Sequence, residues 1–180
     1  SSGNTDTLVL PITVTDVNDQ TPSYSSSDTT PSVAEGTYAV ETLTITDTDT
    51  ADSNTCTLAG VDSGGFTCTV SGDSVSLAFT SAPDYESPTD SDTDNIYAVT
   101  VTISDGANTG STITYAVTVA NSNDAPTVST AIADTSVDED SALSGVAASF
   151  ADVDVGDVLI YSMSGAPSTI LISSSTGAIS

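Results

Sequence analysis

The sequence repeats itself at an interval of about 105 residues. The cluster DVNDQTP at 16–22 returns as NSNDAPT at 121–127, and TDTDTAD at 46–52 returns as ADVDVGD at 151–157. A single interval shared by separate motifs indicates a tandem repeat, in which each repeat is one structural unit. This constrains the architecture more strongly than any local pattern, because the elements of one unit must recur in the next.

The repeat divides the chain into one complete domain and two partial ones. We interpret residues 1–20 as the last strand and linker of a preceding domain, residues 21–122 as a complete domain, and residues 123–180 as the first part of a third. We expect the chain to be a window from a longer array, because a single strand cannot bury its apolar face alone.

Apolar side chains alternate with hydroxyl-bearing or small residues along several short stretches, which is typical of half-buried β-strands. Leu8, Leu10, Ile12 and Val14 show this alternation in the partial first domain. In the complete domain, strands are predicted at 32–34, 38–46, 54–59, 66–70, 74–79, 97–104 and 112–119. No stretch shows a helical apolar stripe, and about seven short strands in roughly a hundred residues favour a two-sheet β-sandwich.

The chain contains 25 Asp and Glu residues but no Lys, Arg or His, and its formal charge is −25. Binding to a nucleic-acid backbone or to an anionic membrane surface needs basic side chains, so no such partner is expected. No apolar run is long enough to cross a bilayer, so we expect no membrane insertion in this segment. The carboxylates repel one another unless cations bind, and the composition therefore favours a protein that binds cations.

The two cysteines, Cys56 and Cys68, are spaced in a way that suits neither a CxxC redox pair nor a four-ligand zinc site. Cys56 shares a strand face with Leu58, and Cys68 shares one with Phe66 and Val70, so both sulfurs are expected to point inward. We predict a disulfide in an exported protein, which would contribute about 3 kcal/mol to stability. Two free buried thiols are the alternative.

The acidic motifs follow one another in an order that resembles cadherin repeats, and most of all the cadherin-like tandem domains of bacterial surface adhesins. Those repeats carry an acidic residue near the first strand, a DxD after the second, an LDRE-like turn, an acidic–Gly step after the sixth strand and a DxNDNxP linker. The resemblance covers essentially the whole chain and implies all-β, tandem seven-stranded Greek-key β-sandwich domains of the cadherin/immunoglobulin-like type, joined end to end. The matching residues here are Glu35, Asp47 and Asp49, Asp84 and Glu86 of PDYE, Asp105 of SDG, and the linkers at 16–22 and 121–126.

The resemblance also implies Ca²⁺ at the junctions between successive domains. Calcium takes roughly six to eight oxygen ligands, more than one loop supplies here, so the ligands are expected to come from both sides of a linker. The first junction would use Asp16, Asn18, Asp19, Asp47, Asp49 and Asp105. The second would use Glu35, Asp84, Glu86, Asn121, Asn123, Asp124, Asp152 and Asp154, and Glu139 would face the next junction. Solvated turn residues and strand caps are the alternative interpretation.

Both linkers depart from the family pattern. Gln20 stands in place of the last Asn of the first linker, while Asn121 replaces the first acid of the second linker and Ala125 replaces its last Asn. Because the second junction has lost formal charge, we expect it to hold fewer ions or to bind them more weakly.

A further acidic stretch, Asp90, Asp92 and Asp94, alternates as in the first half of an EF-hand loop. Position six of that loop would be Asn95 rather than Gly, and position twelve would be Val101 rather than a bidentate Glu. We therefore interpret the stretch as a surface loop, with a weak cation site as the alternative.

Catalysis at neutral pH usually relies on His, a tuned Lys, a Cys–His pair or paired carboxylates. The first three are absent, and the carboxylates cluster with Gly, Pro and Asn rather than beside aromatic sugar platforms. We expect no enzyme, but a structural segment of an extracellular adhesin or surface filament at the cell surface, rigidified by calcium. Its partners would be neighbouring identical or similar repeats in a linear array that can form fibres.

The alternative function is a module that binds carbohydrate or another cell-surface ligand. Such a site usually needs exposed aromatic rings, and Tyr24, Tyr38, Tyr85 and Tyr97 are the tyrosines expected to be available, although they are scattered. The hydroxyl-rich stretch TPSYSSSDTTPS at 21–32 is predicted to carry O-linked glycans.

Overall fold

The computed structural model describes residues 2–3, 5–49, 53–143, 145–147, 149–168 and 170–180. The chain separates into two compact units, Ser1–Ala120 (unit 1) and Asn121–Ser180 (unit 2). Regular structure among the described residues is β-strand throughout, apart from one 3-10 turn at Ser63–Gly65. The expectation of an all-β fold is thus confirmed.

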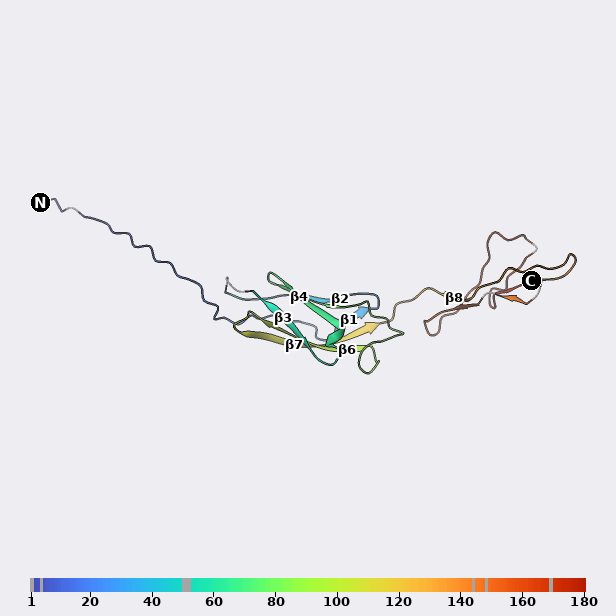
Figure 1. The fold of residues 1–180 in the computed structure, drawn as a ribbon, viewed down its shortest axis with the longest axis horizontal. Helices are drawn as coiled ribbons and strands as arrows, with labels where there is room; N and C mark the ends of the chain where they lie inside the picture. The colour runs from blue at the N-terminus through green and yellow to red at the C-terminus, as the bar shows by residue number, and fades with distance from the viewer. Residues whose placement is uncertain (1, 4, 50–52, 144, 148, 169) are drawn as a thin grey trace. The chain divides into compact units, whose positions relative to one another are not determined.

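Seven strands of unit 1 form two facing sheets (Figure 1). The four-stranded sheet has the order β1-β7-β6-β3 and the three-stranded sheet the order β2-β5-β4. β1 runs parallel to β7, and the other neighbours are antiparallel, which together make the predicted Greek-key β-sandwich. The strands are β1 (Ser32–Ala34), β2 (Ala39–Thr44), β3 (Thr55–Ala59), β4 (Phe66–Ser71), β5 (Ser74–Phe79), β6 (Ile96–Ser104) and β7 (Thr109–Ala120).

The strand boundaries follow the sequence pattern closely. β1 and β5 occupy the predicted residues, whereas β7 begins at Thr109, earlier than the predicted 112. The reason is the hairpin between β6 and β7, in which Thr109 still pairs with Ser104 after a bulge. β4 and β5 are joined by a two-residue turn that uses the positive φ of 56° at Gly72, a conformation that glycine adopts without steric cost.

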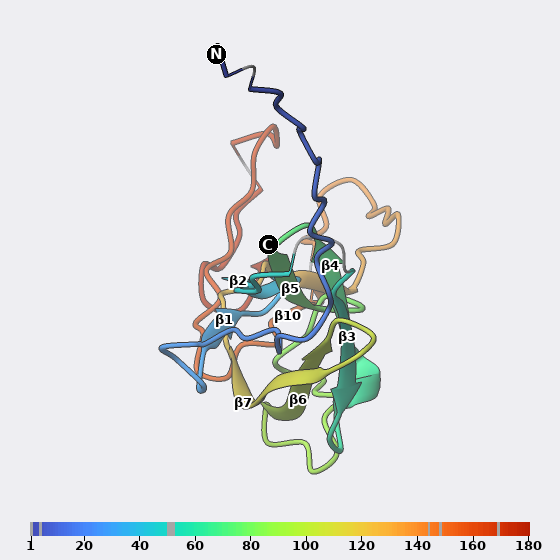
Figure 2. The ribbon, with the colours of Figure 1, turned by 90° about the vertical axis from the view of Figure 1, so that its left-hand side faces the viewer.

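Figure 2 shows the two sheets of unit 1 as ribbons. The side chains on the inward-facing side of each sheet build the core of this unit. β6 buries every second residue and β7 does so from Tyr115 onwards, and Val99, Ile103 and Val117 have no exposed surface. β5 contributes its own alternating set from the opposite sheet, with Leu77 at 5% exposure. Burying each side chain of this size stabilises the fold by about 1.5–3 kcal/mol, and the sandwich is held chiefly by this contact between sheets.

Aromatic rings close one region of this core. The Phe66 and Phe79 ring centroids lie 4.5 Å apart, and the Tyr97 ring meets Phe79 edge-on at 5.2 Å. Tyr97 is 2% exposed and Tyr24 is 7% exposed. The expectation that these two tyrosines are available at the surface is therefore wrong. Tyr97 lies on the inward face of β6, Tyr24 lies in the segment before β1, and both pack in the hydrophobic core.

The predicted disulfide is present, since Cys56 and Cys68 are bonded with their Cα atoms 6.1 Å apart. Cys56 lies in β3 and Cys68 in β4, which belong to different sheets. The bond therefore joins the two sheets covalently across the core, in addition to restricting the unfolded chain.

Residues 5–19 form no strand in the structure, although their alternation predicts one. Leu8, Leu10, Ile12 and Val14 are exposed to between 73% and 93%. No described strand pairs with this segment, and an apolar strand without a neighbour has no hydrogen-bonding partner and no face to bury against.

Unit 2 contains two short antiparallel ladders, one joining β8 (Thr127–Thr130) to β10 (Ser149–Ala151) and one joining β9 (Val146–Ala147) to β11 (Ala178–Ile179). A similar pairing occurs in unit 1, where Ser23 bridges Thr46. It is one residue out of register with the repeat, because Thr127, rather than Val128, pairs with Ala151 in unit 2. An open pocket of about 600 Å³ adjoins this ladder, where the Phe150 and Tyr161 rings lie 5.7 Å apart.

Candidate metal-binding sites

The side chain of Asp49 holds the first linker of the chain through hydrogen bonds. Its Oδ2 accepts hydrogen bonds from the backbone N–H groups of Asp19 at 2.9 Å and of Gln20 at 2.8 Å. Both donors belong to the DVNDQTP motif, and Asp49 closes the DxD that follows β2. The fold therefore brings together two acidic motifs that are about 30 residues apart in the sequence.

Asp47 lies directly beside this contact. Its Oδ1 accepts a hydrogen bond from the Asp49 backbone N–H at 3.1 Å, whereas its Oδ2 is buried and has no hydrogen-bond partner in the part of the chain that the structure describes. Asp47 and Asp49 line a polar pocket of about 520 Å³ together with Asn54 and Asp73. Asn54 Oδ1 is also buried and lacks a partner among the described residues, so two oxygens beside this pocket are available to a cation.

Asp105 is held against the same linker by Asn108. Asn108 Nδ2 donates to Asn18 Oδ1 at 3.2 Å, to the Gln20 carbonyl oxygen at 2.8 Å and to Asp105 Oδ2 at 3.2 Å. Asn18 Nδ2 in turn donates to the Asp105 carbonyl oxygen at 3.4 Å. Burial raises the pKa of the Asp105 carboxyl, but hydrogen bonds from Asn108 and from the Ala107 backbone outweigh it and hold the pKa below its usual value.

The start of β7 fixes the end of this linker. The Ser111 backbone N–H donates to the Pro22 carbonyl oxygen at 3.2 Å, and Pro22 is fully buried. Gly110 permits this approach, because a Cβ atom at that position would clash with the same carbonyl oxygen. The linker is therefore seated on unit 1 by backbone packing as well as by Asp49 and Asn108.

Unit 2 repeats the arrangement of Asp19, Asp47 and Asp49. The Asp124 backbone N–H donates to Asp154 Oδ2 at 2.6 Å, and the Asp154 backbone N–H donates to Asp152 Oδ1 at 3.1 Å. Asp154 is only 9% exposed. Asp152, Asp154 and Asp157 each offer one carboxylate oxygen within 4.8 Å of the others, which is a spacing that one cation can bridge.

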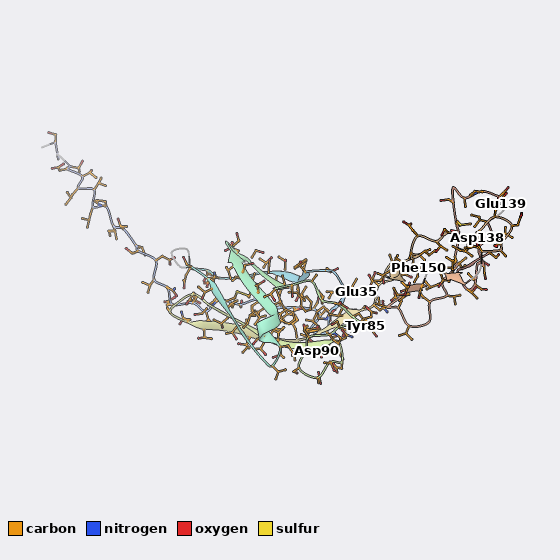
Figure 3. All side chains as sticks on the ribbon, turned by 45° about the vertical axis from the view of Figure 1, so that its right-hand side comes forward. Glu35, Tyr85, Asp90, Asp138, Glu139 and Phe150 are labelled. Carbon is orange, nitrogen blue, oxygen red and sulfur yellow. A yellow bond between two sulfur atoms is a disulfide. The ribbon has the colours of Figure 1, made fainter. Side chains whose placement is uncertain are left out.

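A third group of predicted ligands lies at the other end of unit 1, beyond β1 and before β6. Glu35 Oε2 accepts a hydrogen bond from the Tyr85 backbone N–H at 2.9 Å, and Figure 3 shows Glu35 and Tyr85 next to each other. Asp84 Oδ1 accepts from the backbone of Glu86 and Ser87, both at 3.0 Å. Glu35 and Glu86 offer carboxylate oxygens within 4.8 Å of each other, so the turn PDYE and the residue after β1 converge.

The remaining predicted ligands are linker residues. Asp16, Asn121 and Asn123 are exposed, and Asn123 Nδ2 donates to the Asp124 carbonyl oxygen at 2.7 Å. Glu139 is exposed on a turn of unit 2. The contacts described above thus connect Asn18, Asp19, Asp47, Asp49 and Asp105 in one network, Asp124, Asp152 and Asp154 in a second, and Glu35, Asp84 and Glu86 in a third.

Two residues of these networks were not predicted. Asn108 escaped notice because it carries no charge, although an Asn three residues after Asp105 in a tight hairpin is a recognisable turn signal. Asp157 was visible in the repeat, since it aligns with Asp52, but neither was assigned as a ligand. Asp52 lies outside the described residues.

The structure offers little for an aromatic binding surface on unit 1. Of the four tyrosines expected to be available, only Tyr38 at 54% and Tyr85 at 38% are substantially exposed. They belong to separate segments, one before β2 and one in the PDYE turn. Among the described residues, no helix is long and apolar enough to cross a membrane.

No family model matches the sequence, and no curated protein matches it. Solved structures do match. The human protocadherin-24 EC1-2 structure, form II, aligns with a TM-score of 0.56 at 20% identity, over 89% of this chain and 77% of that chain. The human desmocollin-1 ectodomain aligns with a TM-score of 0.54 at 15% identity, over 92% of this chain and 34% of that chain.

The mouse cadherin-23 EC22-24 structure aligns with a TM-score of 0.51 at 21% identity, over 89% of this chain and 54% of that chain. The chain spans about a third of the desmocollin-1 structure and about half of the cadherin-23 structure. At these identities the similarity concerns the course of the backbone. The fold of the chain is cadherin-like.

Proposed function

We propose that the chain is a non-enzymatic structural segment of an extracellular adhesin or surface filament, in which tandem cadherin-like domains are rigidified by Ca²⁺ at their junctions. The observation that carries this proposal is the duplicated contact between a linker and a DxD motif. Asp19 and Asp49 make it in unit 1, and Asp124 and Asp154 make it in unit 2. Beside the first contact, Asp47 Oδ2 is buried and has no hydrogen-bond partner among the described residues. Beside the second, Asp152, Asp154 and Asp157 each offer one carboxylate oxygen within 4.8 Å of the others.

The charge of the chain supports the same conclusion. The 25 carboxylates have no Lys, Arg or His with which to form ion pairs. Carboxylates gathered within one network repel one another, and the protein can offset this only with protons or with cations from solution. Calcium suits these sites because it accepts carboxylate, amide, carbonyl and water oxygens in flexible geometry.

The ligands of the first site are drawn from unit 1. We assign it to the network around Asp47, with the linker residues before it, and we infer that residues 1–20 belong to a preceding domain that supplies the remaining ligands. The full set from this chain is Asp16, Asn18, Asp19, Asp47, Asp49 and Asp105.

For the second linker, we assign Asn121, Asn123 and Asp124 with Asp152 and Asp154, and we take Glu35, Asp84 and Glu86 as the contribution of the complete domain at 21–122. Asn121 replaces a carboxylate and Ala125 offers no side-chain oxygen. The second linker therefore binds calcium more weakly than the first, and residues 123–180 form the first part of the following domain.

The experiment that tests this function is a calcium titration of the chain, followed by melting temperature and by small-angle scattering. Calcium is expected to raise the melting temperature and to narrow the distribution of interdomain geometries, and excess EDTA reverses both. Magnesium at equal ionic strength is the control, because it separates coordination from simple screening. Melting and scattering that stay the same with calcium and with EDTA would contradict the proposal.

The proposed partners of the chain are neighbouring identical or similar repeats in a linear array. Fibres would form when such arrays associate side by side.

We also propose O-linked glycans on the stretch at 21–32. They are restricted to its exposed hydroxyls, because Pro22 and Tyr24 are buried and Ser26 Oγ donates to Glu41 Oε1 at 2.8 Å. An unmodified peptide mass over this stretch, from the natural host, would remove the glycans from the proposal.

A second candidate function is recognition of a carbohydrate or another cell-surface ligand. The observation in its favour is the open pocket of unit 2, where Phe150 and Tyr161 meet beside Asp152 and Asp157. Apolar rings with nearby acceptors are the usual components of a sugar site. Specific binding on a glycan array, lost in Phe150→Ala, would favour this function over a purely structural one.

A further inference from the structure

Three carboxylates lie together on the loop between β5 and β6, apart from the linkers. Asp90, Asp92 and Asp94 each offer one carboxylate oxygen, and these atoms lie within 4.8 Å of one another. Figure 3 shows Asp90 on this loop, at the end of unit 1 that also carries Glu35 and Tyr85. All three residues belong to unit 1, so the arrangement is independent of the second unit.

Asp90 is the unusual member of this cluster, because it is only 5% exposed. Its Oδ2 accepts a hydrogen bond from the Asp94 backbone N–H at 2.9 Å. Its Oδ1 is buried and has no hydrogen-bond partner among the described residues. A buried carboxylate oxygen without a donor is costly unless a charge of opposite sign compensates it, and the chain has no cationic side chain to do so.

The neighbouring Asp62 shows what a fully satisfied carboxylate looks like in the same region. Asp62 is 8% exposed, and it accepts backbone N–H groups from Ser91 at 2.8 Å and from Ala98 at 2.7 Å, one on each oxygen. Asp62 thus anchors the loop to the start of β6 and needs no ion. Asp90 has the same burial but only one donor, so its second oxygen is the atom left for a ligand.

The backbone of the loop adopts the sharp turn that an EF-hand loop makes with glycine. Asn95 stands at the sixth position and has a φ of 65°, in the left-handed region that Asn tolerates better than most residues. Its side chain donates to the Tyr85 carbonyl oxygen at 2.9 Å, and Asp94 Oδ1 accepts the Ile96 backbone N–H at 2.8 Å. Asn95 therefore has the positive φ that glycine has at position six of an EF-hand loop, although the residue type differs.

We propose that Asp90, Asp92 and Asp94 bind a calcium ion within unit 1, separately from the linker sites. The expected first ligand is Asp90 Oδ1, joined by one oxygen from each of the other two carboxylates. Position twelve of the EF-hand pattern is Val101, which is buried in β6, so no bidentate Glu completes the shell and water fills it. The affinity expected for such a reduced set is on the order of 10⁻⁴–10⁻³ M, as in extracellular modules.

The mutual repulsion within the cluster agrees with this assignment. The three carboxylates offer oxygens within 4.8 Å of one another, so their negative charges repel when no ion is bound. A divalent ion placed among the three groups offsets that repulsion. The same repulsion makes removal of one charge favourable when no ion is present.

The test compares two charge-matched double variants. Asp92→Asn/Asp94→Asn removes two ligands while keeping the shape of the side chains, and Asp6→Asn/Asp134→Asn removes the same charge at exposed positions outside the clusters. Equilibrium dialysis followed by metal analysis is expected to show one calcium ion fewer for the first variant and an unchanged number for the second. Without calcium, the first variant is expected to melt at an equal or higher temperature than the parent chain. An unchanged ion count in Asp92→Asn/Asp94→Asn overturns the proposal.

A local measurement separates this site from the proposed linker sites. Addition of calcium is expected to shift the backbone amide resonances of 91–95 in the parent chain. The shifts are expected to be equal in Asp47→Asn/Asp49→Asn and in Glu35→Gln, because each variant weakens one linker site and changes no residue of the β5–β6 loop. Persistence of these shifts without any calcium effect at 16–20 would refute the linker sites alone. Shifts confined to the linkers would refute the loop site alone.

Discussion

The backbone N–H of Asp19 donates to the carboxylate of Asp49 at 2.9 Å, across 30 residues of sequence. The same pair recurs in unit 2, where Asp124 donates to Asp154 at 2.6 Å, again across 30 residues. Backbone geometry at a linker is rarely so well reproduced by chance between repeats of differing sequence. The carboxylate after β2 thus positions the linker before any ion is considered, and an ion adds to an arrangement that already exists.

Asp49→Ala is expected to loosen the first linker. The variant removes the acceptor of two backbone N–H groups, each worth about 1 kcal/mol, and it removes one proposed calcium ligand. Heteronuclear NOE values at 16–20 are expected to fall, and calcium affinity is expected to fall with them. Asp6→Ala is the matched control, because the only hydrogen bond that Asp6 accepts from the described residues is a local one from Thr7. Equal linker order in the two variants would show that Asp49 does not hold the linker.

Asp105 makes stability depend on acid pH. Its folded pKa lies below the unfolded value of 3.8, so its contribution is present above that value and is lost as pH falls through the lower folded pKa. Urea unfolding between pH 5 and pH 2, in EDTA, is expected to show a shallower loss of stability for Asp105→Asn than for the parent chain. An equal loss of stability with falling pH in both proteins would mean that the Asn108 contacts do not lower the pKa of Asp105.

Buried tyrosines make stability depend on alkaline pH. Burial, opposed in part by a backbone hydrogen bond, raises the pKa of Tyr24 to about 12 from 10.0, and burial together with Glu41 raises the pKa of Tyr115 further. Stability is therefore full below pH 10 and is lost as pH rises through the folded values, because the unfolded chain ionises first. Melting temperature measured from pH 8 to pH 12 is expected to fall less steeply in Tyr24→Phe than in Tyr38→Phe, whose ring is 54% exposed.

Loss of the disulfide is expected to lower the free energy of unfolding by about 3 kcal/mol. The bond between Cys56 and Cys68 closes a short loop of the unfolded chain, so its loss acts mainly by raising the entropy of the unfolded state. The measurement is urea unfolding of Cys56→Ala/Cys68→Ala beside the parent chain with and without reductant. Reductant should destabilise only the parent chain, and a parent chain indifferent to reductant would contradict the prediction.

Gly110→Ala is expected to displace the linker from β7. The new Cβ meets the Pro22 carbonyl oxygen, a backbone atom, and a backbone shift of this kind costs about 1–3 kcal/mol. Gly64→Ala is the control, since nothing lies within 4 Å of a Cβ at that position. Amide exchange at Ser111, which donates to Pro22, reports the displacement directly, and protection that matches the Gly64→Ala variant would refute it.

The strands of unit 1 could be predicted because their alternation is local and strong. The same alternation explains the error over Tyr97, whose ring shares the inward face of β6 with Val99 and Val101. A tyrosine at such a position follows its strand and is buried. Between Leu8 and Val14 the alternation predicts a strand that the structure does not contain, and these apolar side chains are exposed. A strand also needs a neighbouring strand, and the alternation carries no information on whether one is present.

The candidate ligands that recur in both repeats could be predicted from the sequence. The contacts that depend on the hairpin between β6 and β7 could not. Alignment placed Asp49 and Asp154 in equivalent roles before their contacts were known. The part played by Asn108 depends on the close turn between β6 and β7, which carries its amide back to Asn18. No spacing in the sequence specifies that path, since the two residues are 90 positions apart.

The parallel pairing of β1 with β7 decides how the domain bears tension. Ser32 pairs with Thr118 and Ala34 with Ala120, so an early segment of the domain lies along its last strand. Upstream of β1, the carbonyl oxygens of Pro22 and Thr29 also accept hydrogen bonds from β7. A pull on the two ends slides these strands along each other, and their evenly spaced hydrogen bonds share the load together instead of opening one by one. β1, the shortest strand of the sandwich, is therefore one part of the contact that would resist such a pull.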